Sequence, residues 1–175
     1  IGAANLAAAL REPLMAESPV IAIHGGPTSG DRYKNLYQDV DDIPAFQAYS
    51  RWGAVIENPS RINDLFDQAY RYAVSGSPSP TWLQVPGFWG AMAMQPCDQE
   101  ASVDPRYSRV NSVRPIPALE DLELAAKIIS AAKRPVLIAG GGAVTSGAGE
   151  VISMVAQLLD MAVVTGTAAK SLLPE

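Results

Sequence analysis

The residues best suited to chemistry follow short apolar runs of the sequence. His24, the one histidine of the chain, comes directly after the run at 20–23, which has the composition of a strand buried on both faces. Ligands of open α/β sheets gather at the carboxyl ends of strands, so a histidine here could transfer a proton or bind a ligand. The alternative is a loop histidine whose hydrogen bonds are satisfied locally. With one histidine in the chain, a Cys/His metal cluster is excluded.

Three consecutive glycines form a second candidate site. Gly140, Gly141 and Gly142 follow the apolar run at 135–139 and precede a helical segment. Their backbone could approach a phosphate closely, and the next helix would offer its N-terminal amides. The run departs from G-x-G-x-x-G, because Thr145 stands where the third glycine belongs, and no P-loop lysine follows. A nucleotide site and a plain tight turn between strand and helix are therefore both open.

Two further groups have a structural and a functional interpretation. Asp39, Asp41 and Asp42 could bind a divalent cation, but acidic residues are also common at the start of a helix, where the helix dipole favours them. Aromatic residues around a predicted strand end favour packing at a domain junction over a substrate-lining role: Trp82, Phe88 and Trp89. The sequence holds no nucleophile elbow, kinase motif or zinc motif.

The elements that would position these residues alternate between helix and strand, which predicts an α/β fold with parallel-sheet, three-layer units. Residues 3–16 favour a helix that Pro13 kinks or shortens, and residues 25–30 have the composition of a loop. The helix expected at 119–132 carries an apolar stripe that should face inward: Leu119, Leu122, Ala126 and Ile129. Further strands are expected at 52–56, 81–85, 135–139 and 161–165, and further helices at 40–49, 61–74 and 147–159.

The bulk composition is that of a globular protein. Of the 175 residues 48% are hydrophobic and 18% charged, which is enough apolar material for a packed core. A formal net charge of -5 argues against a nucleic-acid partner, and the absence of a run of 18 apolar residues argues against a membrane span. The single cysteine, Cys97, cannot form an internal disulfide and fits a reducing cytoplasm, so we expect a cytoplasmic protein. Both ends of the chain look cut from something longer.

The order of weak motifs in the first half of the chain is more specific than any one of them. Residues 2–6 and 18–25 resemble the G-A-T-N-L and S-V-P-V-V-A-I-T-G segments of acetolactate synthases and their relatives. Residues 37–41 look like that family's F-Q-E-V-D. Residues 75–80 and 85–86 look like its S-G-R-P-G-P and the I-P that follows.

The second half continues the resemblance, which covers nearly all of the chain. Residues 131–142 are similar to the start of the family's central domain, and 163–175 to its V-V-T-T...G-K-G-x-x-P-E. The resemblance implies that 1–86 are the C-terminal half of a pyrimidine-binding domain and that 118–175 are the first half of a central Rossmann-like domain. Residues 87–117, which are aperiodic, would be a linker between these two partial domains.

Thiamine diphosphate with Mg²⁺, bound between two subunits, is the cofactor that the resemblance implies. The glutamate that activates the cofactor would lie upstream of Gly2, and the domain for the diphosphate and the metal would lie downstream, so the chain alone should be inactive. The full-length enzyme would be a homodimer or homotetramer. By resemblance, Gly2, Asn5, Gly25 and Gly26 would lie on the pyrimidine side of the cofactor. His24 and Gln38 would lie near the reaction centre.

The chain also departs from the family pattern. Gly26 stands where relatives often have glutamine, and Gln84 replaces a usual aspartate. Ala169 and Ser171 replace the glycines beside the family's lysine, which weakens the case for FAD and leaves another nucleotide open. The resemblance therefore implies a divergent decarboxylase, carboligase or acyl transferase that acts on a 2-keto acid or aldehyde. The alternative is a non-catalytic α/β module that binds a nucleotide at 140–142.

Overall fold

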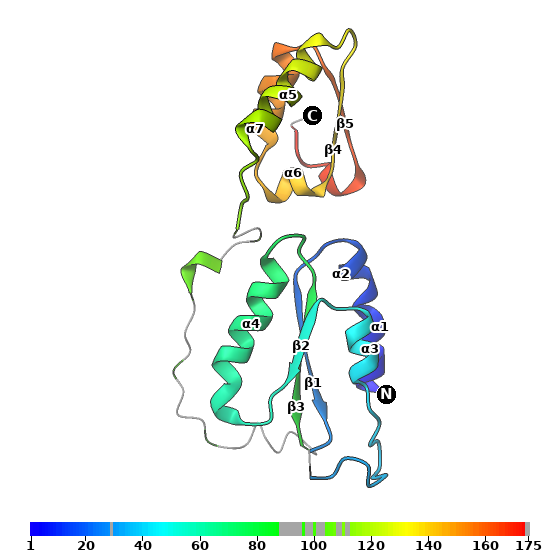
Figure 1. Cartoon of the computed structure of the whole chain (residues 1–175). Coiled ribbons are helices and arrows are strands. Elements are labelled where there is room, and N and C mark those ends of the chain that lie inside the picture. The colour runs from blue at the N-terminus through cyan, green and yellow to red at the C-terminus, as the bar shows by residue number, and fades with distance from the viewer. Residues whose placement is uncertain are drawn as a thin grey trace. The chain divides into compact units, whose positions relative to one another are not determined.

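Figure 1 shows the computed structural model of the chain, which describes residues 1–28, 30–87, 96, 100, 104–107, 110 and 113–173. The chain divides into two compact units, residues 1–112 and 113–175, and each has its own parallel sheet. The division falls within 87–117, the stretch expected to be a linker. Most of that stretch lies outside the described residues, as do Phe88, Trp89 and Cys97.

A three-stranded sheet forms the centre of the first unit. β1 (Val20–Gly26), β2 (Trp52–Val55) and β3 (Pro80–Pro86) are all parallel and lie in the order β1-β3-β2. β3 pairs with β1 along its whole length, so that Gly26 lies opposite Pro86. As the central strand, β3 is buried at every position but one. The carboxyl ends of β1 and β3 therefore lie side by side.

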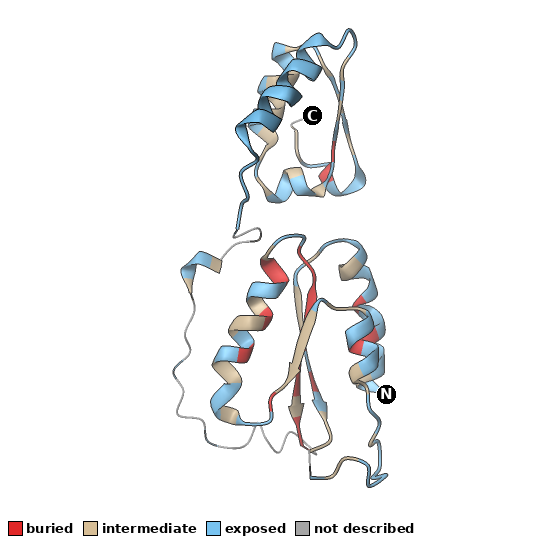
Figure 2. Cartoon of the chain, in the orientation of Figure 1, coloured by how far each residue is buried: buried red, intermediate tan, exposed pale blue. Residues whose placement is uncertain are grey.

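Helices pack on both faces of this sheet (Figure 1). α1 (Gly2–Ala9), α2 (Arg11–Met15) and α3 (Ile43–Ala48) lie on one face, and α4 (Ile62–Val74) lies on the other. Figure 2 shows the buried residues along the sheet and on the helix faces turned toward it. One core cluster, under α1 and α3, consists of Ala7, Leu10, Ala22, Phe46 and Trp82; the other, under α4, consists of Ile56, Leu65, Ala69 and Leu83.

Two short 3-10 turns complete the described part of this unit. η1 (Pro59–Arg61) leads into α4, and its N-terminus is capped by Asn58, whose side-chain oxygen accepts from the backbone N–H of Ser60 at 2.9 Å. η3 (Pro105–Tyr107) lies against α4, where Arg71 is stacked over the ring of Tyr107.

The second unit has a two-stranded sheet. Its elements are α5 (Leu119–Ala131), β4 (Val136–Ala139), α6 (Gly141–Thr145), α7 (Gly149–Leu158), β5 (Ala162–Thr165) and η4 (Thr167–Ala169). β4 and β5 pair in parallel, and Figure 1 shows α5 and α7 to one side of them. The exposed residues alternate along both strands, so one face of the sheet is open to solvent: Val136, Ile138, Ala162 and Val164.

The expected helix at 3–16 and the expected loop at 25–30 both need correction. Two helices replace the first, and the break falls at Leu10 rather than at Pro13. Proline has no N–H for the carbonyl four residues earlier, which is that of Ala9, the last residue of α1. Gly25 and Gly26 belong to β1 and not to a loop, because their backbone pairs with β3.

Two expectations for the second unit were also wrong. Gly141 and Gly142 do not form a tight turn, because they are the first two residues of the short helix α6. The stripe of α5 that was expected to face inward is exposed, since α5 has no buried residue. A sheet of two strands offers too little surface to cover that stripe. Among the helices that the structure describes, none combines the length and apolar character needed to cross a bilayer.

Candidate functional site

A cavity of about 470 Å³ opens at the carboxyl end of β1. Its walls come from the start of α1, the end of β1 and the segment 37–42 that precedes α3. Asn5, one of the residues singled out from the sequence, does not line it and lies exposed on α1. Five other such residues line this cavity together: Gly2, His24, Gly25, Gly26 and Gln38.

His24 lies inside β1 with its side chain in the apolar core, and not in a loop. Its exposed fraction is 8%. The imidazole stacks on the ring of Phe46, with centroids 3.9 Å apart and planes inclined by 4°, and Trp82 is tilted against it at 5.9 Å. An aromatic residue of α3 and one of β3 therefore fix the orientation of the ring.

The hydrogen bonding of His24 identifies its tautomer. Nδ1 lies 2.8 Å from the carbonyl oxygen of Gly25, and a carbonyl can only accept, so Nδ1 carries the proton. Nε2 then holds a lone pair, and it is buried with no hydrogen-bond partner among the residues that the structure describes. Burial lowers the pKa of His24 below its usual 6.5, although the Gly25 hydrogen bond and the charge of Asp42 oppose this. At neutral pH the imidazole is therefore uncharged and can accept a hydrogen bond at Nε2.

Glycine shapes the floor of the cavity at the end of β1. A Cβ at Gly25 would have no heavy atom within 4 Å, so a ligand has free access to the backbone there. A Cβ at Gly26 would overlap the side chain of Gln84, which extends across from β3. Gln84 is 2% exposed, and its side chain takes the space that the glycine leaves free.

The segment between β1 and α3 carries an unusual backbone. Tyr33, Asn35 and Gln38 have φ values of 66°, 54° and 61°, in the left-handed region that non-glycine residues seldom occupy. Gln38 is exposed at the mouth of the cavity. Backbone strain of this kind gathers at ligand-binding segments, where the surroundings hold it in place.

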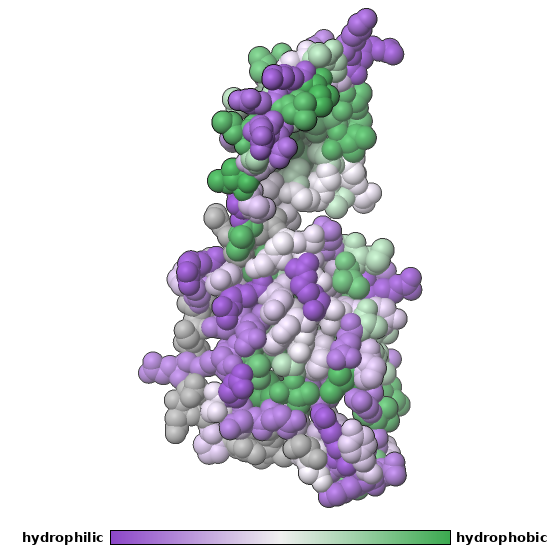
Figure 3. All heavy atoms as spheres, viewed as in Figure 1, coloured by the Kyte–Doolittle hydropathy of each residue, from purple (hydrophilic) through white to green (hydrophobic). Residues whose placement is uncertain are grey.

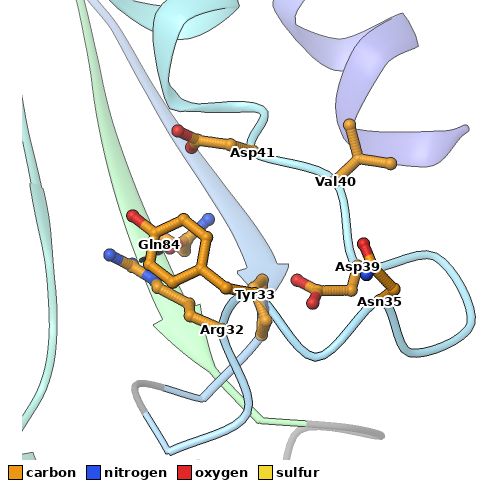
Figure 4. Close-up of a pocket in the computed structure, with 8 residues that line it drawn as sticks. Arg32, Tyr33, Asn35, Asp39, Val40, Asp41 and Gln84 are labelled. Carbon is orange, nitrogen blue, oxygen red and sulfur yellow. Dashed lines mark hydrogen bonds between the residues drawn. The ribbon is translucent and has the colours of Figure 1, made fainter.

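A second cavity, of about 110 Å³, lies beside the first and shares Pro27, Asp39 and Val40 with it. Figure 4 shows its polar side chains. The guanidinium of Arg32 reaches Gln84, and Nη2 donates to Oε1 at 3.4 Å. Sequence reasoning missed Arg32 and also Phe46. No local sequence pattern identifies them. The hydrogen-bond partner of Arg32 is 52 positions away, and Phe46 has the pattern of an ordinary core residue of a helix.

The aspartates of this segment have two kinds of surroundings, which are the start of α3 and the two cavities. The side chain of Asp41 accepts from the backbone N–H of Ile43 at the start of α3, which is the structural role weighed for this group. Asp39 lines both cavities, Asp41 also lines the smaller one, and Asp42 lines the larger one. Within the described residues, no three His, Cys, Asp or Glu side chains are grouped as metal ligands.

The glycines at 140–142 belong to the second unit, whereas the residues described above belong to the first. α6 has only five residues, and a Cβ at Gly141 would come within 3.2 Å of the Cβ of Ala168 in η4. Gly141 thus allows α6 to pack closely on η4. A Cβ at Gly140 or Gly142 would meet nothing within 4 Å.

Comparison with known proteins gives a family for part of the chain. Residues 122–175 match the family described as "Thiamine pyrophosphate enzyme, central domain". This match covers most of the second unit, from α5 to the end of the chain.

Similarity to curated proteins extends over both units. The chain is 29% identical to a "Probable acetolactate synthase large subunit" from Methanocaldococcus jannaschii, over 99% of this chain and 29% of that protein. It is 27% identical to the acetolactate synthase large subunit of Corynebacterium glutamicum, over 99% of this chain and 27% of that protein. It is also 28% identical to a "Probable 2-ketoarginine decarboxylase AruI" from Pseudomonas aeruginosa, over 99% of this chain and 30% of that protein.

The chain spans less than a third of the length of these relatives. The chain shows distant homology to acetolactate synthase large subunits over nearly its whole length, and its residues 122–175 match the central-domain family of thiamine pyrophosphate enzymes.

Proposed function

We propose that this chain is part of a thiamine-diphosphate-dependent enzyme that acts on a 2-keto acid or aldehyde as a decarboxylase, carboligase or acyl transferase. The observation that carries the proposal is the cavity at the end of β1. Five of the residues assigned to the cofactor side or the reaction centre by resemblance line this one space, although Gly2 and Gln38 are 36 positions apart. The similarity to acetolactate synthases and to a 2-ketoarginine decarboxylase supports the substrate class.

The domain assignment is part of this proposal. Residues 1–86 are the C-terminal half of a pyrimidine-binding domain, and 118–175 are the first half of a central domain. The match at 122–175 supports the second half of the assignment. The sheet of the first unit, with helices on both faces and a cavity at its carboxyl edge, supports the first half.

The residues of the larger cavity fit one half of the cofactor. Ile1, Leu6 and Val40 supply apolar walls for a flat aminopyrimidine ring, and the backbone at Gly25 is accessible. No lysine or arginine is among the described residues that line it, so the diphosphate and its Mg²⁺ would be held by other parts of the enzyme. When bound, thiamine diphosphate supplies a carbanion that attacks a carbonyl carbon and a ring that accepts electrons on decarboxylation.

The tautomer of His24 limits what this residue does. The neutral ring donates only from Nδ1, and that proton is bonded to Gly25. His24 therefore acts as a positioning residue, because its Nδ1 donates to the carbonyl of Gly25 at the cavity and its Nε2 is buried away from a ligand there. Gln38, exposed at the cavity mouth, has both a donor and an acceptor to position the substrate.

The experiment is a reconstitution of the complete enzyme. Apoenzyme is assayed for release of CO₂ from a panel of 2-keto acids, with and without thiamine diphosphate and Mg²⁺. Gln38→Ala should lower turnover at least about tenfold, as positioned polar groups commonly do. Gln47→Ala is the matched control, because Gln47 is exposed on α3 and lines neither cavity.

Cofactor-independent turnover, or equal activity of the two variants, would count against the proposal. A second measurement uses the 175-residue chain alone. Calorimetry with Mg²⁺ present should show weak or no binding of thiamine diphosphate, because the charged diphosphate contacts would be absent. Micromolar binding would show that the chain holds the whole cofactor and that the domain assignment is wrong.

A further inference from the structure

Arg32 is bound to an uncharged partner. Its guanidinium donates to the side-chain amide of Gln84, whereas Arg61 and Arg106 form ion pairs with Asp64 and Asp104. No ion pair joins Arg32 to a carboxylate among the residues that the structure describes. Its positive charge is therefore not neutralised by direct contact.

Gln84 gives this guanidinium one long hydrogen bond, with Nη2 and Oε1 3.4 Å apart. The amide is buried in β3 and is fitted against Gly26, so its oxygen is a fixed acceptor for Arg32. A guanidinium has five N–H donors, and one of them is used here. The remaining donors form a planar fork of the kind that binds a carboxylate with two hydrogen bonds.

The cavity that Arg32 lines has room for one small group. A volume of about 110 Å³ is a few times the share of one water molecule, enough for a carboxylate and the carbon atoms that carry it. Asp39 and Asp41 line the same cavity. Two carboxylates nearby would repel a dianion such as phosphate more strongly than a singly charged carboxylate.

The position of this cavity relates it to the proposed reaction site. It adjoins the larger cavity through Pro27, Asp39 and Val40, and His24, Gly25 and Gly26 line only the larger one. A substrate whose carbonyl lies in the larger cavity would place its other end beside Arg32.

We propose that Arg32, held by Gln84, binds a carboxylate at the end of the substrate remote from the reacting carbonyl. The inference rests on the proposed function and narrows it, because the substrate is then a 2-keto acid or aldehyde that carries a further carboxylate. Arg32 is a specificity-determining residue in this scheme and takes no part in bond making or breaking.

The test compares matched substrates on the complete, cofactor-loaded enzyme. The value of kcat/KM for 2-oxoglutarate should exceed that for 2-oxopentanoate, which has the same chain length without the second carboxylate, by at least about tenfold. Arg32→Gln should remove this preference and leave kcat/KM for 2-oxopentanoate within about twofold of wild type. Arg32→Lys, which keeps the charge but loses the planar fork, should retain part of the preference.

Lys34→Gln is the matched control, because it removes one positive charge from the same segment but Lys34 is exposed and lines neither cavity. It should leave the preference unchanged. An equal loss for both substrates in Arg32→Gln would overturn the inference, since Arg32 would then act on the reacting end or on the fold. A wild-type enzyme that prefers 2-oxopentanoate would overturn it as well.

A binding measurement separates this inference from the proposed function. Glutarate and inorganic phosphate are titrated into wild type and Arg32→Gln by calorimetry, without any turnover. Glutarate binding that is lost in Arg32→Gln supports the subsite, even if no 2-keto acid is turned over and the proposed function fails. Tighter binding of phosphate than of glutarate, or glutarate binding that Arg32→Gln leaves intact, contradicts it.

Discussion

His24 gives the first unit a stability that depends on pH. Its pKa is lowered chiefly by burial, so the unfolded chain binds a proton more readily than the folded one. The sign follows from proton linkage: the stabilisation is complete above the unfolded pKa of 6.5 and is lost as pH falls through the lower, folded pKa. We therefore expect the free energy of unfolding, measured with urea between pH 8 and pH 5, to decrease as the solution becomes acidic.

The control is His24→Phe, which keeps an aromatic ring against Phe46 and removes the titrating group. The variant should lose the part of the pH dependence that lies below 6.5. A profile identical to wild type would show that other groups cause the dependence and that His24 titrates normally.

Trp82 of the neighbouring strand leaves no room for a side chain at Gly53 in β2. A Cβ at this position would overlap the indole ring, which is 3% exposed and lies in the central strand. The ring is packed against those of His24 and Phe46, so Gly53→Ala should lower the free energy of unfolding by about 1–3 kcal/mol. Gly25→Ala is the control, because its Cβ would meet nothing within 4 Å, and it should stay within about 0.5 kcal/mol of wild type. Equal effects in thermal or urea melts would contradict the packing argument.

Some residues of the candidate site could be identified from the sequence, and others could not. His24, Gln38 and the glycines near position 25 stand out because they end an apolar run or match a motif. The partners that set their chemistry do not stand out. Phe46 and Gln84 are ordinary residues in ordinary patterns, and only the folded sheet brings them to His24 and Arg32.

At the scale of elements, the end of α4 is contacted by the side chain of the residue that precedes β2. Nη1 of Arg51 donates to the carbonyl oxygen of Ser75 at 2.6 Å and to that of Tyr72 at 3.4 Å, at the end of the helix. These carbonyls have no intrahelical donor, and a cation there also complements the helix dipole. Arg51→Met should therefore reduce the free energy of unfolding by about 1 kcal/mol.

Arg11→Met gives the comparison, since Arg11 is exposed on α2 and belongs to a helix on the other face of the sheet. It should change stability by less than about 0.5 kcal/mol. Losses of equal size in urea denaturation would mean that Arg51 contributes only as a surface charge.

The alternation of helix and strand was predictable, and the ends of the elements were not. β1 extends three residues beyond its expected end at 23, because Gly25 and Gly26 have a paired neighbour in β3. The composition of 25–30 indicates a loop, since glycine and proline disfavour strands when nothing is known of the partner strand. Pairing decides where a parallel strand stops, and pairing is a property of the sheet.

At the scale of the whole molecule, the second unit exposes much of its apolar material. Figure 3 shows apolar residues on its surface, and the residues of its open sheet face include Ile138, which is 79% exposed. Ile138→Ser should change the free energy of unfolding by less than about 0.5 kcal/mol. The same substitution should reduce self-association of the 175-residue chain, measured by sedimentation, because it interrupts an exposed apolar patch.

Leu137 is the matched position, since it precedes Ile138 and faces the partly covered side of β4. Leu137→Ser should cost about 2 kcal/mol, because it removes packed methyl groups. If the two substitutions destabilise the chain equally, the face that carries Ile138 is covered in solution.

The fit of Gln84 against Gly26 has a consequence for the history of this sequence. The two residues lie on neighbouring strands, and the side chain of one fills the space that the other leaves free. A mutation that adds a side chain at 26 while Gln84 is present would be selected against, whereas the same mutation after 84 has become shorter would be tolerated. The two positions should therefore vary together among homologues, with glycine at 26 wherever a long amide occupies 84. A lineage that began with the family's glutamine at 26 and aspartate at 84 would have had to change 26 to glycine before 84 became glutamine.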